Sequence, residues 1–138
     1  MEQSSAVLPV LAMMGLTAAA GLRLFWLRLG ALRRGRLTLA YLRTGEGKPP
    51  PEAVVAAARH FSNLLEVPVL FYVACVMALA LGQADQTFVV LAWLFVASRA
   101  VHSAVHLTYN NPFHRFAAYA IGCVVLVVLV VRLAVVIV

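Results

Sequence analysis

The chain has 138 residues, of which 64% are hydrophobic, and its mean hydropathy of +0.95 is far too high for a soluble domain of this size. The formal net charge is +6, but the basic residues lie beside apolar segments rather than along a polar face, which argues against nucleic-acid binding. About 20 apolar residues cross a bilayer, so the chain has room for four spans and little else. We expect one membrane domain over residues 1–138.

Four apolar segments predict four membrane helices. The first covers about residues 7–29, and the polar segment after it ends in the helix-breaking run GEGKPPP. The second covers about residues 53–81 and contains Pro68, which should kink it. The third and fourth cover about residues 87–107 and 113–138, and the run YNNP separates them. The last segment is rich in valine but too long and apolar for a strand, so the predicted fold is an all-α, integral membrane four-helix bundle.

The first residues and the cysteines indicate no processing or redox chemistry. The run MEQSS has an acid and no base, so it lacks the positive region of a signal peptide, and we expect the first span to remain in the mature protein. Cys75 and Cys123 each fall inside a predicted span and form no CxxC motif, so both are expected to be small buried apolar residues.

The distribution of basic residues predicts the orientation in the membrane. Seven basic residues flank or occupy the first loop, whereas the opposite side carries Glu2, Asp85 and one arginine near the end of the last helix. The seven are Arg28, Arg33, Arg34, Arg36, Arg43, Lys48 and Arg59. Loops rich in lysine and arginine usually stay on the cytoplasmic side of a membrane. Both loops should therefore be cytoplasmic and both termini should lie outside the cytoplasm, in what we expect to be a bacterial inner membrane.

A polar stripe opens the second span in the segment RHFSNLLEVP. At about 100° per residue, Asn63 lies about 40° from Arg59, and Glu66 lies about 20° on the other side of Arg59. A carboxylate in an apolar helix costs about 2–3 kcal/mol on insertion scales, so it usually has a partner. We expect Glu66 to pair inside the bundle with Arg59 or with Arg99 of the third span.

A second polar cluster spans the break between the last two helices. Arg99, His102 and His106 follow one another at i, i+3 and i+7, on one face of the third span. Arg115 opens the fourth span and Tyr119 follows one turn later, so both clusters can meet in one layer of the bundle. The histidine spacing also suits zinc or haem, with a carboxylate of the second span as third ligand, but a metal site needs three or four ligands and we assign none.

These residues resemble the MAPEG family, the membrane-associated proteins in eicosanoid and glutathione metabolism, and in particular the microsomal glutathione transferases. The resemblance rests on the four-span size, the basic first loop and two motif regions. The first region is RxxxNxxE followed by a proline in the second helix. The second, across the third and fourth helices, is RxxH from Arg99 to His102, then NP at residues 111–112, Arg115 and Tyr119. It covers nearly the whole chain. It implies a homotrimer of four-helix protomers that binds glutathione between neighbouring protomers, near the cytoplasmic side, while lipophilic electrophiles arrive from the bilayer.

The resemblance also implies roles for individual residues. Arg59, Asn63 and Glu66 match the glutathione-binding cluster of the second helix, and Arg99 and His106 are expected to contribute to the same binding site. Arg115 matches the arginine that stabilises the glutathione thiolate, and Tyr119 matches an aromatic residue that contacts the peptide. We therefore expect a glutathione transferase or peroxidase whose cosubstrate is glutathione and whose partners are membrane lipids, lipophilic small molecules and copies of the chain itself.

Two positions keep a second reading open. Ser62 precedes the asparagine, where the synthase-like members often have a basic residue, and His106 takes the place of a common tyrosine. The family also includes a non-catalytic lipid-binding member, so a lipid-binding function in the same cleft is the alternative. A haem or metal protein centred on His102 and His106 is a third reading.

The predicted orientation is testable with reporter fusions. Alkaline phosphatase folds outside the cytoplasm, so a C-terminal phosphatase fusion should be active, whereas a green fluorescent protein fusion at the same place should be dark. Fusions inserted after Lys48 should give the opposite pair of results. A fluorescent and phosphatase-negative C-terminus would reverse the topology.

Overall fold

The computed structural model of the protein describes residues 3–137, and within them the fold is helical, without strands. In chain order the elements are η1 (Gln3–Ala6), α1 (Val7–Arg33), α2 (Leu39–Thr44), α3 (Glu52–Ala80), α4 (Gln86–Leu107) and α5 (Pro112–Ile137). The four long helices confirm the predicted all-α membrane bundle, since each is long and apolar enough to cross a bilayer. Glu2 and the predicted end of the last span at residue 138 lie outside the described residues.

The first loop differs from the prediction because it contains a short helix. The helix α1 runs one turn beyond its expected end, to Arg33, and α2 then forms inside the segment expected to be an irregular polar loop. The Thr38 side chain caps α2 by accepting a hydrogen bond from the Tyr41 backbone N–H at 3.2 Å, and Gly45 ends it in the left-handed conformation with φ 74°. Tyr41 packs on a small apolar cluster at the end of α1, which holds α2 in place.

The turn between α3 and α4 ties that end of the bundle together. Helix α3 continues without interruption through Pro68, and Gly82, with φ 67°, turns the chain after it. Asp85 caps α4 by accepting a hydrogen bond from the Phe88 backbone N–H at 2.9 Å. Its second carboxylate oxygen pairs with Arg132 near the end of α5, so one acid serves two helices.

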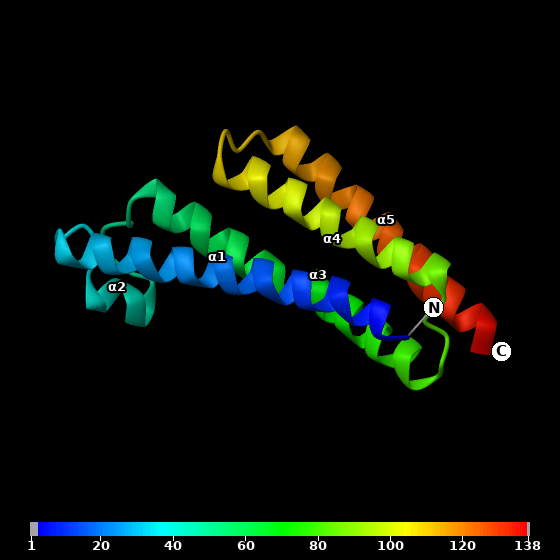
Figure 1. Ribbon diagram of the computed structural model, residues 1–138. Coiled ribbons are helices and arrows are strands. Elements are labelled where there is room, and N and C mark those ends of the chain that lie inside the picture. The colour runs from blue at the N-terminus through cyan, green and yellow to red at the C-terminus, as the bar shows by residue number, and fades with distance from the viewer. Residues whose placement is uncertain (1–2, 138) are drawn as a thin grey trace.

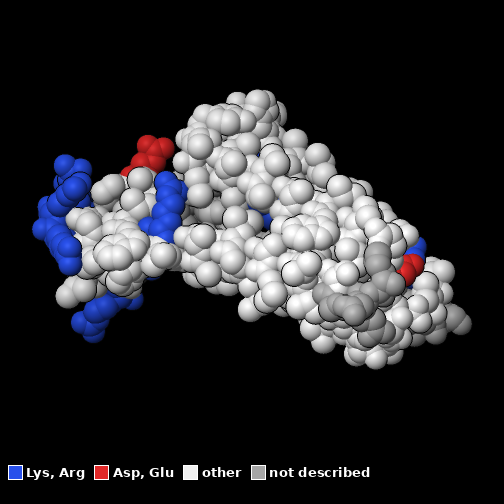
Figure 2. All heavy atoms as spheres, viewed as in Figure 1, with Lys and Arg blue, Asp and Glu red and all other residues white. Residues whose placement is uncertain are grey.

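The four long helices form two antiparallel pairs, α1 with α3 and α4 with α5 (Figure 1). The segment with α2 and the α4–α5 turn lie at one end of the molecule, which we name the loop end, and both termini lie at the opposite end. Figure 2 shows that lysine and arginine side chains gather at the end that carries α2, while the middle of the face in view is almost free of charged side chains. The two loops thus share one side, as the topology prediction requires.

The apolar core occupies the half of the bundle nearer the termini. The Phe71 and Phe95 rings stack at 4.6 Å between centroids and join α3 to α4. The largest core side chains are all at most 1% exposed: Met13, Leu64, Phe71, Phe88, Phe95 and Leu129. The outer faces of the helices carry exposed leucine, valine and phenylalanine, as expected where lipid tails are the solvent. The buried polar side chains belong to the parts of α3 and α4 nearer the loop end.

Candidate functional site

Arg99 lies at the boundary between the apolar core and the loop end, and its side chain is 0% exposed. Its Nη2 donates a hydrogen bond to the backbone carbonyl oxygen of Tyr119 on α5 at 2.8 Å. The guanidinium carbon also lies 4.7 Å from the centroid of the Tyr119 ring and 5.5 Å from that of Phe95. Aromatic faces attract a cation at such distances, so they replace part of the lost hydration. Among the described residues, its Nε and Nη1 atoms have no hydrogen-bond partner.

Three buried histidines follow Arg99 toward the loop end. The ring centroids of His60 and His106 are 5.2 Å apart, those of His102 and His106 5.8 Å, and those of His60 and His102 6.1 Å. The His102 Nδ1 lies 3.0 Å from the carbonyl oxygen of Arg115, and because a carbonyl only accepts, that nitrogen carries the proton. In the part of the chain that the structure describes, four ring nitrogens are buried without a hydrogen-bond partner: both nitrogens of His60, Nε2 of His102 and Nδ1 of His106. This is a polar layer inside an otherwise apolar bundle.

The first turn of α5 forms one wall of a cavity of about 240 Å³, next to this layer. Arg115 lies at that wall, and its Nη1 donates a hydrogen bond to Oδ1 of Asn110 at 3.0 Å. The cavity is lined by Asn63, His102, Pro112, Arg115, Phe116 and Tyr119. The Asn63 Oδ1 is buried without a hydrogen-bond partner within residues 3–137, so it is free to accept a hydrogen bond from a ligand. The structure thus brings three predicted site residues, Asn63, Arg115 and Tyr119, to one cavity.

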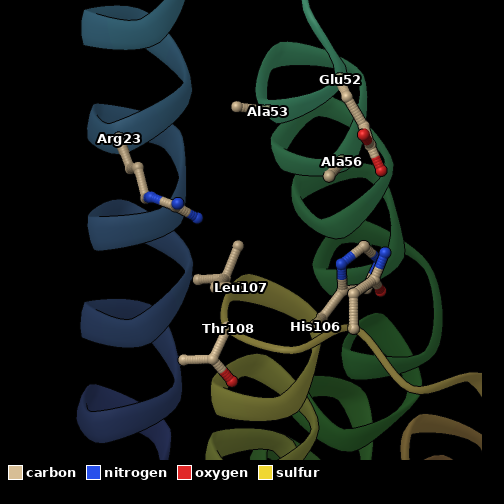
Figure 3. Close-up of a pocket in the computed structure, with 8 residues that line it drawn as sticks. Arg23, Glu52, Ala53, Ala56, His106, Leu107 and Thr108 are labelled. Carbon is tan, nitrogen blue, oxygen red and sulfur yellow. The ribbon is translucent and has the colours of Figure 1, made fainter.

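A second cavity, of about 260 Å³, lies among α1, α3 and α4 at the loop end. Figure 3 shows Arg23 extending from α1 toward the space between Ala56 of α3 and Leu107 of α4. His106 lines this cavity rather than the first one. The histidine layer therefore lies between two polar cavities, since His102 lines the first.

The predicted pairing of Glu66 inside the bundle is wrong for the protomer. Glu66 and Arg59 are both exposed, and within the described residues the ion pair between Asp85 and an arginine of α5 is the only one. Glu66 instead accepts a hydrogen bond from the Ser62 hydroxyl at 3.3 Å. The physical reason is helical geometry: Leu64 points into the core, and a residue two positions later lies about 200° further around the helix. Arg59, Asn63 and Glu66 do lie along one side of α3, but this side faces outward, and only Asn63 is near enough to the interior to line a cavity.

The carboxylate expected as a third metal ligand does not lie with the histidines. Glu66 is exposed on the outer side of α3, away from the buried His102 and His106. In the part of the chain that the structure describes, no three His, Cys, Asp or Glu side chains come together as a metal site.

Sequence reasoning missed two residues of this region. His60 belongs to the series Ala57, His60, Leu64 and Phe71, whose spacing of three, four and seven marks the buried face of α3, and this signal could have found it. Asn110 was interpreted only as part of a helix-breaking run. Its contact with Arg115 depends on a backbone conformation that the sequence alone does not reveal.

A comparison with protein-family models gives one match, and it covers almost the whole chain. The sequence model of the MAPEG family matches residues 2–135. No curated protein and no solved structure shows a significant match.

The close contact between α4 and α5 at Arg99 should not tolerate a larger residue at Gly122. A Cβ atom there would lie 2.5 Å from both Arg99 Nη2 and Ser98 Oγ, and both side chains already have fixed hydrogen bonds. Overpacking of this kind costs about 1–3 kcal/mol, so Gly122→Ala should unfold at a lower temperature in detergent.

Gly15→Ala is the matched control, because nothing lies within 4 Å of its Cβ position and alanine is the better helix former. It should unfold at or slightly above the wild-type temperature. Equal unfolding temperatures for the two variants would contradict the close packing.

Proposed function

Because the chain belongs to the MAPEG family, we propose that it binds glutathione at the loop end and joins it through its sulfur to lipophilic electrophiles, or uses it to reduce them. The single observation that carries this proposal is the cavity that joins Arg115, Asn63 and Tyr119. It offers a cation, an unpartnered amide oxygen and an aromatic side chain next to one another at the edge of a membrane bundle. Glutathione is an anionic peptide with a thiol, and each of these groups suits one part of it.

The proposed role of Arg115 is to stabilise the thiolate. A free thiol has a pKa near ~8.5, so a cation close to the sulfur raises the thiolate fraction at neutral pH. Arg115 also lies in the first turn of α5, where the helix dipole adds positive potential. The thiol proton leaves to water, the sulfur lone pair forms a bond to the electrophilic carbon, and the leaving group departs with its bonding electrons.

We propose that the complete site lies between copies of the chain in a homotrimer. Ligand pockets usually measure about 300–1,000 Å³, and the cavity of about 240 Å³ in one protomer is smaller than that. Arg59 and Glu66 are exposed on α3 and do not line this cavity, so a neighbouring protomer could bring them into a larger pocket. A neighbouring protomer over this face would also remove the cost of leaving Glu66 against lipid.

A second candidate function is lipid binding without catalysis. A groove of about 600 Å³ runs between α4 and α5 and is lined mainly by aliphatic side chains, among them Leu94, Val101 and Ile121. It suits an acyl chain, and it also suits the lipophilic substrate of a transferase. Binding of glutathione separates the two candidates, so isothermal titration of the purified protein with glutathione is the deciding measurement.

Replacing Arg115 should reduce turnover more than binding. If its charge acts mainly on the thiolate, Arg115→Ala should lower kcat by about ten- to a hundredfold and change KM much less. Arg115→Lys should recover part of the rate, because a point charge still stabilises a sulfur anion. The measurement is conjugation of a chloronitrobenzene substrate.

Arg43→Ala is the control for this experiment, since Arg43 is an exposed arginine of α2 outside the cavity. It should keep the wild-type rate. Equal rates for Arg115→Ala and wild type would contradict the role of Arg115 in stabilising the thiolate. If calorimetry detects no binding of glutathione, lipid binding remains as the candidate function.

Removing the charge of Glu66 should weaken assembly if a neighbouring protomer covers it. Glu66→Gln keeps the shape and loses the charge, so native mass spectrometry should show fewer trimers at a given protein concentration. Glu46→Gln, the same change in the exposed first loop, should have no effect. A monomeric wild type, or an unchanged trimer fraction in Glu66→Gln, would contradict the shared interface.

A further inference from the structure

Asn110 has an unusual backbone conformation. Within the described residues it is the only non-glycine residue with positive φ, at 48°. Asparagine enters this left-handed region more readily than most residues, but it is still uncommon there. The Asn110 N–H donates a hydrogen bond to the carbonyl oxygen of Val105 at 2.8 Å, five residues back, which closes the end of α4. The sharp turn that follows brings the Asn110 side chain to the start of α5.

The two adjacent asparagines of this turn have separate contacts. Asn111 caps α5, because its Oδ1 accepts hydrogen bonds from the backbone N–H groups of Phe113 at 2.9 Å and His114 at 3.3 Å. The Oδ1 of Asn110 instead accepts a hydrogen bond from Nη1 of Arg115 at 3.0 Å. The Asn111 amide therefore caps α5, and the Asn110 amide binds the guanidinium of Arg115.

Arg115 is held at both of its ends. His102 on α4 donates its Nδ1–H to the backbone carbonyl oxygen of Arg115 at 3.0 Å, and Asn110 accepts from the guanidinium. The other guanidinium N–H groups have no protein partner in the described part of the chain, and Arg115 lines the cavity with Asn63 and Tyr119. A fixed side chain with unused donors at a cavity is arranged to meet a ligand.

The chemistry of the partner matters as much as its position. A carboxylate in place of Asn110 would hold the guanidinium equally well but would neutralise its charge. The neutral amide fixes Arg115 and leaves its full positive charge for an anionic ligand. We propose that Asn110 is a positioning residue that holds the Arg115 guanidinium against the thiolate, an inference that rests on the thiol-transferring function proposed above.

Three variants separate the possible roles of Asn110. Asn110→Gly removes the amide but accepts a positive φ freely, so the turn and the fold should persist. Asn110→Asp keeps an acceptor in place and adds a negative charge. Asn111→Ser is the matched control, because it removes the neighbouring amide while serine still caps the helix.

The enzyme measurements follow from these roles. Asn110→Gly should lower kcat by about three- to tenfold with KM nearly unchanged, and the thiolate fraction of bound glutathione, followed by its ultraviolet absorbance across pH, should fall by a similar factor. Asn110→Asp should lower the thiolate fraction further, although it holds the arginine. Asn111→Ser should match wild type in both measurements.

A measurement on the protein alone tests the positioning without glutathione. Phenylglyoxal modifies arginine, and mass spectrometry gives the rate at Arg115. This rate should rise several-fold in Asn110→Gly, while the rate at the exposed Arg43 of α2 stays constant. Wild-type values of kcat, thiolate fraction and Arg115 modification in Asn110→Gly would overturn the inference. If wild type binds no glutathione, the proposed function fails, and the modification rate still decides whether Asn110 holds Arg115.

Discussion

A buried guanidinium determines how the last two helices meet. A cation removed from water costs several kcal/mol unless other groups replace its hydration, and here the Tyr119 carbonyl and two aromatic rings do so in part. Arg99 reaches that carbonyl only because Gly122 leaves room beside it. The contact therefore fixes the register of α5 on α4. Arg115 belongs to the same helix, so its place relative to the histidine layer depends on this contact.

The polar residues divide into two groups with different surroundings. Arg99 and the three histidines are buried within one protomer, and their positions are set by packing and by contacts with α5. Arg59 and Glu66 are exposed on α3, and the one side-chain hydrogen bond of Glu66 among the described residues comes from Ser62, a neighbour on the same helix. The inner group thus forms a stiff support, while the outer group is available to a neighbour or a ligand. Asn63 lies where the two groups meet.

The sequence was sufficient for the helices but only partly for the site. Long apolar runs and Pro, Gly and Asn breaks predict the four long helices directly, whereas α2 depends on a Thr38 cap and a Tyr41 contact that composition does not reveal. Periodicity placed Asn63 and Glu66 on one stripe correctly. The apolar series that includes Leu64 and Phe71 marks the other side of α3 as the buried one, but the assumption that a charge must be interior gave the wrong answer for Glu66. The link between Asn110 and Arg115 required three-dimensional structure.

The position of the aromatic core has a consequence for the membrane itself. Both polar cavities are at the loop end, and the stacked rings of Phe71 and Phe95, together with Leu129, fill the bundle beyond them. Water that enters either cavity meets closely packed apolar side chains, in which an ion is strongly disfavoured. The bundle can therefore hold a hydrated, charged site within the thickness of the bilayer without becoming a leak for protons or salt. The electrical insulation of the membrane is preserved by the same side chains that hold the helices together.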